Sequence, residues 1–419
     1  MQATAENLPT LKPNPNWAKL PLFNRKNWSR VRFDDVVENL NETCDPAEAG
    51  LERVIAMEHL EPGSLHIRAW GNVADGTTFT RRCRPGQVLF GKRRAYQRKV
   101  AVAEFDAVVS GDIYVLAPKG DRLLPELLPF LCLSERFFQH AVGTSAGSLS
   151  PRTNWSSLAS FEFDLPPLDQ QRRIAEILWA VDEVPQRWKA CENQHAQSLY
   201  EFVSGLTLRG LKDGGMQTSP IGKIPNSWRC VRLEDVTVSS AYGPRFPGSQ
   251  YTPDGNVRTI RTTDFGDFGE INFTGVPAAT LDGDTISAHR LQTGDFLLSR
   301  SGQQAGLTAV FRGPDNGIAY VAGAFLIRYR LRPELNPDFL LALCQGRYGD
   351  KFVRALVQGG DQKNISGSDF SRLYIPVPSI EVQNEIVGSI TSLRTTGLAI
   401  AKHRASSEVL LNSTLNTVL

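Results

Sequence analysis

The segment PPLDQQRRI (residues 166–174) recurs in altered form as PSIEVQNEI (residues 378–386), and each version opens a stretch of helical character. An earlier segment, WSRVRFDDV (residues 28–36), recurs as WRCVRLEDV (residues 228–236). The offset between the copies therefore grows from 200 residues at the first pair to 212 at the second. Each copy is predicted to be one whole domain followed by one helix, with about twelve extra loop residues in the second copy.

Two copies with so long a period are too few for a solenoid, which stacks several short repeats. The repeat instead predicts a pseudo-twofold molecule, and such a molecule suits a target with two related halves. The 419 residues also exceed what one hydrophobic core usually supports, so length alone predicts two domains. The predicted boundaries are residues 1–166 for the first domain, 167–219 for the first long helix and linker, 220–377 for the second domain and 378–419 for the second long helix.

Composition is ordinary for a soluble globular protein, with 41% hydrophobic and 21% charged residues. No apolar run approaches the roughly 20 residues that cross a bilayer, so no membrane association is expected. The first residues, MQATAENLPTLKPNPNW, lack the basic start and apolar core of a signal peptide, which predicts a cytoplasmic protein. Widely spaced cysteines without a CxxC or Cys/His cluster predict buried free thiols and neither a zinc site nor a disulfide framework. These cysteines are Cys44, Cys83, Cys132, Cys191, Cys230 and Cys344.

Apolar residues follow a three-and-four spacing in both long helices, which is typical of a coiled-coil seam. We expect the two seams to pack against each other, because pairing buries both. His195 lies within the first seam and is interpreted as a tolerated or hydrogen-bonded seam residue. The predicted seams are Ile174, Ile177 or Leu178, Val181, Val184, Trp188, Cys191, His195, Leu199, Phe202 and Leu206 in the first helix, and Ile386, Ile390, Leu393, Gly397, Ile400, Arg404, Ser407, Leu411, Leu415 and Val418 in the second.

Two helix-breaking residues occupy equivalent positions, because Pro185 in the first helix aligns with Gly397 in the second. Inside a helix, proline costs about 3 kcal/mol and glycine up to about 1 kcal/mol. The coincidence in position predicts a shared bend or break in both helices. The alternative is that the alignment of the two residues is accidental.

Basic residues are concentrated in the first copy, where eight Lys or Arg and no acidic residue lie between Asp75 and Glu104. The run surrounds a strand-like segment, GQVLFG (residues 86–91). A strand that leads into a basic loop with an aromatic tip would hold guanidinium groups against phosphates or guanine edges, and the alternative is a solvated charged face. The candidate DNA-binding residues are Arg81, Arg82, Lys92, Arg93, Arg94, Tyr96, Arg98 and Lys99, with Arg84 in the same run.

The second copy keeps the strand but changes its tip, which reads GDFLLSRSGQQ (residues 294–304). A similar framework with different loop residues is expected of two domains that recognise different DNA sequences. Each candidate could equally be turn chemistry on a solvated surface. The candidate DNA-binding residues of this copy are Arg245, Arg261, Arg300, Ser301 and Gln303.

Motifs of common catalytic sites are absent from the sequence, including GxxxxGK[ST], HExxH and GxSxG. The glycine-rich segment GTSAGS (residues 143–148) lacks the lysine of a phosphate-binding loop and is a weak match. We therefore expect a non-catalytic chain, with no catalytic or metal-binding residues of its own.

Several segments, in their order along the chain, closely resemble the specificity subunit of type I restriction-modification enzymes. The strand and basic loop VLFGKRRAYQRKVAV (residues 88–102) come first, followed by the Pro-x-x-x-x-Gln helix start, the linker IGKIPNSW (residues 221–228) and a second such unit. The resemblance covers essentially the whole chain, and the repeated helix start together with the linker is specific. It implies an α/β (α+β) fold, in which two pseudo-repeated target recognition domains are separated by two long antiparallel coiled-coil helices.

The resemblance also implies a function and partners. Each recognition domain would bind one half of a bipartite, asymmetric site in double-stranded DNA, and the chain would dock two copies of an adenine DNA methyltransferase subunit. Motor and nuclease restriction subunits would join through the methyltransferase. S-adenosylmethionine, ATP and Mg would be bound by these partner subunits, and this chain would bind no cofactor.

Other classes of protein stay open. A nuclease or methyltransferase fused to its own reader would act on DNA alone. A stand-alone, pseudo-dimeric DNA-binding regulator would bind its site tightly without a methyltransferase, although such regulators usually consist of two short helix-turn-helix chains. A protein-interaction scaffold would bind without a steep dependence on salt. The chain could also be the reader of another DNA-modification or defence system.

Overall fold

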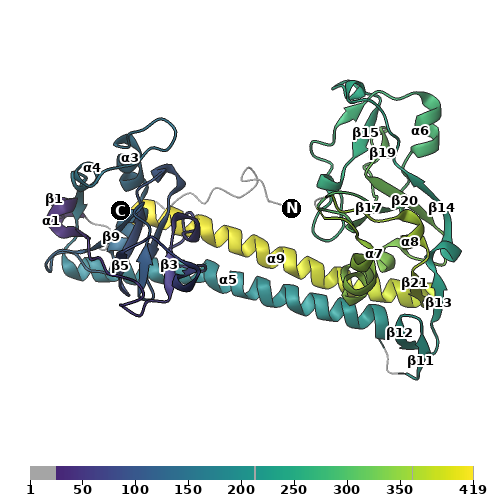
Figure 1. The fold of residues 1–419 in the computed structure, drawn as a ribbon, viewed down its shortest axis with the longest axis horizontal. Helices are drawn as coiled ribbons and strands as arrows, with labels where there is room; N and C mark the ends of the chain where they lie inside the picture. Colours follow the sequence, from purple (N-terminus) through teal and green to yellow (C-terminus); the bar gives the residue numbers. More distant parts are fainter. Residues whose placement is uncertain (1–24, 212–213, 361, 419) are drawn as a thin grey trace. The chain divides into compact units, whose positions relative to one another are not determined.

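The structure is a computed structural model that describes residues 25–211, 214–360 and 362–418. The predicted signal-peptide-free start of the chain lies outside these residues. The described chain divides into two compact units. The first unit comprises residues 25–188 and 403–418, and the second comprises residues 189–211, 214–360 and 362–402. Each unit thus holds one domain and part of each long helix (Figure 1).

The first domain runs from β1 to β10 and leads into the long helix α5. Its elements are β1 (Ser29–Arg32), α1 (Phe33–Val36), β2 (Val37–Leu40), β3 (Arg53–Ile55), β4 (Gly71–Asn72), β5 (Arg81–Cys83), β6 (Val88–Gly91), β7 (Val100–Val102), β8 (Ala107–Val109), β9 (Ile113–Pro118), α2 (Leu128–Leu133), α3 (Glu135–Gly143), α4 (Trp155–Ala159), β10 (Glu162–Leu165) and then α5 (Leu168–Arg209).

The second domain begins with a short hairpin, β11 with β12, and leads into the long helix α9. Its elements are β11 (Met216–Ser219), β12 (Gly222–Pro225), β13 (Arg229–Arg232), β14 (Thr237–Tyr242), β15 (Val257–Ile260), β16 (Ala278–Ala279), α6 (Gly283–His289), β17 (Phe296–Ser299), β18 (Thr308–Val310), β19 (Ala319–Ala322), β20 (Leu326–Leu331), α7 (Pro337–Gln345), α8 (Gly367–Ser371), β21 (Tyr374–Val377) and then α9 (Ile380–Val418).

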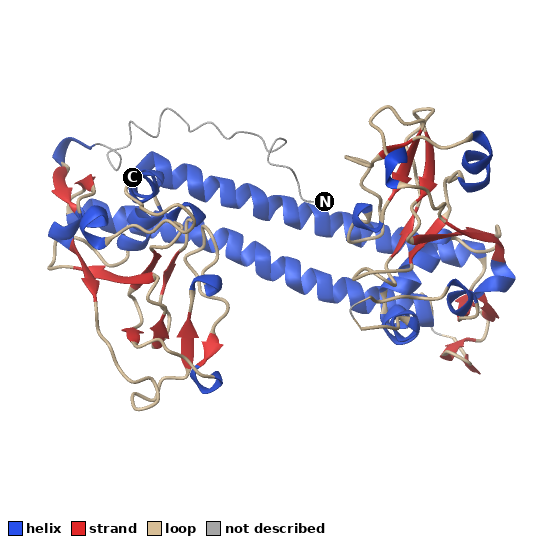
Figure 2. Ribbon diagram, turned by 45° about the horizontal axis from the view of Figure 1, so that its top comes forward, coloured by secondary structure: helices blue, strands red, loops and turns tan. Residues whose placement is uncertain are grey.

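The two domains share one topology, which confirms the internal repeat. A four-stranded sheet has the order β2-β9-β6-β7 in the first domain and the matching order β14-β20-β17-β18 in the second. A second sheet is built around one parallel pair, β3 with β8 or β15 with β19, and the first domain adds β5 at its edge (Figure 2). In both domains the opening strand pairs antiparallel with the last strand before the long helix, β1 with β10 and β13 with β21.

The repeated WSRVRFDDV segment has the same local structure in both copies. A short strand turns into one helical turn, and the backbone N–H of the last strand residue donates to an aspartate three positions on. The bond joins Arg32 to Asp35 Oδ2 over 3.1 Å in the first domain. It joins Arg232 to Asp235 Oδ2 over 3.1 Å in the second. An aspartate in this position satisfies a backbone N–H that the turn would otherwise leave unpaired.

A buried glutamine near the start of each long helix fastens the helix to its domain. The Gln171 side chain donates through Nε2 to the carbonyl oxygens of Arg122, at 2.7 Å, and Pro166, at 2.9 Å. Its Oε1 accepts the backbone N–H of Leu124 over 2.9 Å. Three bonds to backbone groups therefore fix the direction in which the helix leaves the domain.

Gln383 repeats this arrangement with every partner displaced by 212 residues. It donates through Nε2 to the carbonyl oxygens of Glu334, at 2.8 Å, and Pro378, at 2.9 Å. Its Oε1 accepts the backbone N–H of Asn336 over 2.8 Å. The Pro-x-x-x-x-Gln pattern thus encodes the buried hydrogen bonds between the long helix and its domain. The need for these bonds in both domains explains why the motif recurs.

The long helices run antiparallel, because each hydrophobic core contains the start of one helix and the end of the other. Ile174 and Leu178, from the start of α5, share the first core with Leu411 and Leu415, from the end of α9. The second core joins the end of α5 to the start of α9 through apolar residues of both helices. These residues are Leu199, Val203, Leu206, Ile386 and Ile390. The predicted fold class is confirmed.

The seam of α9 is buried or half-buried along its predicted residues, but the predicted seam of α5 is partly wrong. Three of its predicted residues are exposed: Val184, Cys191 and Phe202. Pro185 is buried in place of Val184, and Val203 is buried in place of Phe202. Both registers keep the three-and-four spacing, so the pattern alone did not distinguish them. The exposed Cys191 also corrects the expectation that all the thiols are buried, although the cysteines are free as predicted.

Neither helix breaks at Pro185 or Gly397, because α5 and α9 continue through both residues, and a bend there stays a prediction. Gly397 has a packing role: a Cβ atom there would lie 2.9 Å from Nε2 of His195. His195 donates from this nitrogen to the Leu393 carbonyl oxygen over 3.0 Å, which confirms it as a hydrogen-bonded seam residue. No helix in the described part of the chain is long and apolar enough to span a membrane.

The contact between His195 and Gly397 yields a test of the helix pairing. Gly397→Ala should destabilise the chain, because the new methyl group displaces the imidazole from the Leu393 carbonyl oxygen. Gly388→Ala is the matched control on the same helix: its Cβ would meet open space, so better helix propensity should stabilise by up to about 1 kcal/mol. Urea unfolding of both variants gives the two signs. Equal stabilisation by both substitutions would contradict the proposed contact.

Candidate nucleic-acid interface

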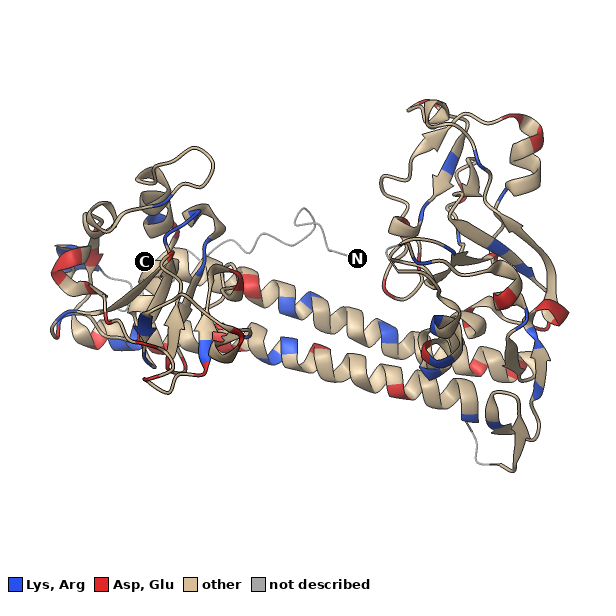
Figure 3. Cartoon of the chain, viewed as in Figure 1, with Lys and Arg blue, Asp and Glu red and all other residues tan. Residues whose placement is uncertain are grey.

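Most of the basic run in the first copy is used for contacts within the domain. Lys/Arg and Asp/Glu segments are interspersed over the first unit in Figure 3. Arg81 donates to the Ile113 carbonyl oxygen over 2.9 Å. Arg82 forms an ion pair with Asp106 at 2.8 Å. Arg84, which belongs to the same run, binds Glu42 through two nitrogens at 2.6 and 3.0 Å.

Residues nearer the loop tip are bonded in the same way. Lys99 Nζ donates to the Met57 carbonyl oxygen over 2.6 Å. Arg98 NH1 reaches Glu135 at 2.5 Å and its guanidinium also lies over the Phe138 ring. These side chains stabilise the domain, so the count of local basic residues overstated the free positive charge.

Lys92 is half-buried at the end of β6, with its ammonium 4.9 Å from the centre of the Tyr114 ring. Burial lowers the pKa of Lys92, and the nearby charge of Arg81 adds to the effect. The adjacent Arg93 donates to Ser150 Oγ over 2.6 Å and lies 3.4 Å from Asp112. Both side chains therefore have contacts within the domain, although the Arg93 side chain is also 41% exposed.

Arg94 and Tyr96 remain as the candidates for direct DNA contact in this loop. Tyr96 is 56% exposed. Arg94 adopts a left-handed backbone conformation, with φ of 52°, and its Nε is buried without a hydrogen-bond partner in the described structure. Arg98, at the other end of the short turn, is also left-handed, with φ of 55°. Such conformations are uncommon for residues other than glycine and are concentrated at functional sites.

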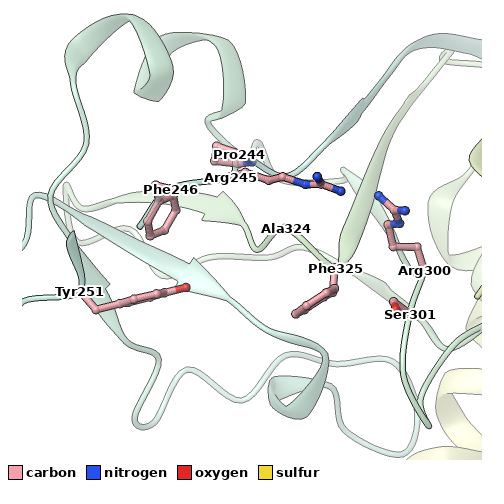
Figure 4. Close-up of a pocket in the computed structure, with 8 residues that line it drawn as sticks. All are labelled: Pro244, Arg245, Phe246, Tyr251, Arg300, Ser301, Ala324 and Phe325. Carbon is pink, nitrogen blue, oxygen red and sulfur yellow. The ribbon is translucent and has the colours of Figure 1, made fainter. Parts of the chain in front are cut away.

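The second copy brings together three of its five candidates around an open hollow of about 500 Å³. Figure 4 shows the guanidinium groups of Arg245 and Arg300 pointing toward each other across this hollow. Ser301 lies beside Arg300, and Phe325 is 64% exposed at the rim. None of the eight lining residues is acidic: Pro244, Arg245, Phe246, Tyr251, Arg300, Ser301, Ala324 and Phe325. Two like charges that converge without a carboxylate form a natural site for an electronegative ligand.

Arg300 is held in place before any ligand arrives. Its backbone N–H donates to the Phe325 carbonyl oxygen over 2.8 Å, and its guanidinium lies 4.8 Å from the centre of the Tyr242 ring. A guanidinium stacked on an aromatic ring keeps its plane, which suits two-bond contacts to guanine or phosphate. Sequence reasoning identified Arg300 and Arg245 but missed Phe325.

The other two candidates of the second copy do not join this hollow. Arg261 binds the buried Asp264 through NH2 at 2.8 Å and so serves the local turn. Gln303 is exposed on the turn after β17 but does not line the hollow. Among the described residues, no group of three or more His, Cys, Asp or Glu is arranged to hold a metal ion.

One backbone hydrogen bond is present in both domains, but the residues that form it have different side chains. Lys92 N–H donates to the Asp112 carbonyl oxygen over 2.9 Å, in the place where Arg300 N–H donates to Phe325. Asp112 binds Arg93 and Arg152. Burial opposes ionisation of Asp112, but its bonds and charge contacts with these arginines hold its pKa below the usual value. The first domain thus presents two arginines that share one aspartate, where the second presents an aromatic ring and two arginines without an acidic neighbour in the hollow.

The family model described as "Type I restriction modification DNA specificity domain" matches residues 26–187 and 225–409. The chain therefore belongs to the type I restriction-modification DNA specificity family, and the sequence-based interpretation as a DNA sequence-specificity subunit of such a system is confirmed.

Individual relatives agree with this membership. The MjaVIII specificity subunit of Methanocaldococcus jannaschii is 23% identical over 74% of this chain and 69% of its own length. The EcoDI specificity subunit of Escherichia coli is 28% identical, over 38% of this chain and 36% of its own length. A solved chain from work on complex assembly and conformational transition of the type I R-M system has a TM-score of 0.65 at 21% identity. The match covers 93% of this chain and 97% of that one, and it supports the fold.

The hollow and the basic loop differ in how much of their positive charge is not paired within the domain. The salt dependence of DNA affinity measures this difference. Replacing Arg245 and Arg300 together with Gln should weaken DNA binding and lower the slope of log affinity against log salt by roughly one unit per lost phosphate contact. Arg94→Gln should act likewise in the first domain. Arg82→Gln is the matched control, because its charge is already paired with Asp106. A control slope that falls as much as the Arg245/Arg300 slope would contradict this assignment.

Proposed function

We propose that the chain reads a bipartite, asymmetric DNA site in the cytoplasm, with one half of the site bound by each domain. The observation that carries the proposal is that the two domains share the same helix-start bonds and main-sheet order but have different residues at the matching strand ends. The bonds of Gln171 and Gln383 repeat partner by partner, whereas the strand-end positions hold Lys92 and Asp112 in one domain and Arg300 and Phe325 in the other. The shared backbone framework would let both domains dock on DNA in the same way. The different strand-end side chains would let each domain recognise its own DNA sequence.

In this proposal the chain has no catalytic role, and the reaction belongs to its partners. An adenine DNA methyltransferase would bind S-adenosylmethionine and methylate the site. Motor and nuclease subunits, joined through the methyltransferase, would use ATP and Mg. The present chain would supply sequence selection, which agrees with the absence of catalytic motifs from its sequence.

The proposal also assigns two methyltransferase subunits to each chain. The frame around the helix starts of α5 and α9 is repeated, so any protein that binds one of these surfaces meets a second, equivalent surface. Repeated surfaces within one chain bind identical partners for the same reason that symmetric oligomers do.

Domain exchange tests the bipartite assignment. Replacing residues 29–165, from β1 to β10, with the corresponding segment of a related specificity subunit should change one half of the methylated site and leave the other half as it was. Modified-base sequencing of a host that carries the hybrid and its methyltransferase gives the site directly. The reciprocal exchange of residues 229–377 is the control and should change only the other half. Changes in both halves after a single exchange would contradict the proposal.

Native mass spectrometry tests the copy number. The purified complex of this chain with its methyltransferase should contain two methyltransferase subunits per chain, since the two docking surfaces are equivalent. Substitutions on only one surface should reduce the complex to a single methyltransferase. A one-to-one assembly that is the only active form would disprove the symmetric arrangement.

A further inference from the structure

The glycine-rich segment that fails as a phosphate-binding loop forms a closed projection between α3 and α4. Ala146 and Arg152 exchange two backbone hydrogen bonds, at 2.9 and 3.0 Å, and so close a loop of the five residues 147–151. Gly147 takes a φ of 113°, which few other residues adopt. Leu149 is at the centre of this loop and is 90% exposed.

This loop is bound to the basic loop of the same domain. Arg94 N–H donates to the Pro151 carbonyl oxygen over 2.7 Å. Arg93 Nε donates to Ser150 Oγ over 2.6 Å, and Arg93 and Arg152 are also backbone bridge partners. The leucine therefore projects from a supported turn that carries arginines at its base.

A single exposed apolar residue is ordinary on a protein surface. Leu149 differs because its loop is closed, fixed to a neighbouring loop and centred on the leucine, so the fold holds the side chain in water. Burying such a side chain is favourable by about 1.5–3 kcal/mol. A ligand that covers Leu149 would gain this free energy. DNA-binding proteins insert leucine and similar side chains between base steps, with basic residues on the flanking phosphates.

We propose that Leu149 is an apolar wedge that enters the base stack of the half-site read by the first domain and partly unstacks one base step. This inference rests on the proposed function, since it presupposes that the first domain binds duplex DNA. Arg93 and Arg152, at the base of the loop, are two cations that share the single carboxylate of Asp112, so positive charge remains there for the phosphates that flank the opened step. Unstacking costs least at pyrimidine–purine steps, so this half-site contains such a step at the point of insertion.

The second domain has the matching backbone bridge at the base of the corresponding segment. Gln358 and Asn364 exchange two backbone bonds, at 2.7 and 2.8 Å, in the place of Ala146 and Arg152. Gly302 N–H donates to the Lys363 carbonyl oxygen over 2.9 Å, which matches the bond from Arg94 to Pro151. The sequence of this loop, GGDQK (residues 359–363), contains no large apolar residue. The wedge therefore acts in one half of the site only.

The test uses the complex of the full chain with its methyltransferase and a duplex that carries the site found by modified-base sequencing. 2-Aminopurine, whose fluorescence rises when it unstacks, replaces one base at a time in the half-site of the first domain, but never the methylated base. Wild type and Leu149→Met should raise the fluorescence at one step, and Leu149→Ala and Leu149→Ser should not. Leu149→Ala should bind roughly tenfold more weakly with an unchanged salt slope, because no charge is lost.

Val142→Ala is the matched control, because Val142 is also exposed, at 42%, but belongs to α3 outside the loop. It should keep both affinity and fluorescence. No rise at any position with wild type, or an equal rise with Leu149→Ala, would overturn the wedge. Loss of methyltransferase from the Leu149→Ala complex would also overturn it, since the leucine would then be a protein contact. Failure of the proposed function is distinct, because wild type would then show no site-specific binding.

Discussion

A buried glutamine amide makes the organisation of this chain possible, and it does so twice. Gln171 and Gln383 each bind three backbone groups of their own domain at the point where a long helix begins. A buried amide that lost one of these bonds would cost about 1–3 kcal/mol, so the exit direction of each helix is tightly specified. Each glutamine thus holds the start of one long helix at a core that also contains the end of the other.

The fixed frame leaves the loop tips free to vary. Strand-end residues such as Lys92 and Arg300 are positioned by backbone bonds that do not depend on their side chains. Substitution there would change the surface of the domain without removing these backbone bonds. The result is a first domain with paired charges and a projecting leucine, and a second domain with unshielded arginines around an aromatic hollow. Under the proposed function, the specificity of each domain would reside in these side chains.

The sequence predicted the helix starts and the seam of α9 because these depend on local patterns, and it predicted the repeat because short local segments recur 200 to 212 residues apart. It did not predict the fate of the basic run, since the acidic partners Glu42 and Glu135 are distant in sequence. It also named Arg245 and Arg300 separately, although 3D packing alone brings them to one hollow. The register of α5 was missed at Val184 because two registers have the same spacing. No break occurs at Gly397, and the sequence did not show that the glycine leaves room for His195, because that residue lies 202 positions earlier in the chain.

The composition of the first core has a consequence for synthesis of the chain. Leu411, Leu415 and Val418 complete a core whose other members are translated far earlier. At about 5–20 residues per second, ribosomes take on the order of tens of seconds to add the residues between Leu178 and Leu411. Throughout that interval the first domain to emerge keeps an uncovered apolar surface, whereas the second has its helix partners almost at once. The core of the second domain is therefore completed before that of the first. The first domain, although it is translated earlier, depends longest on protection from aggregation.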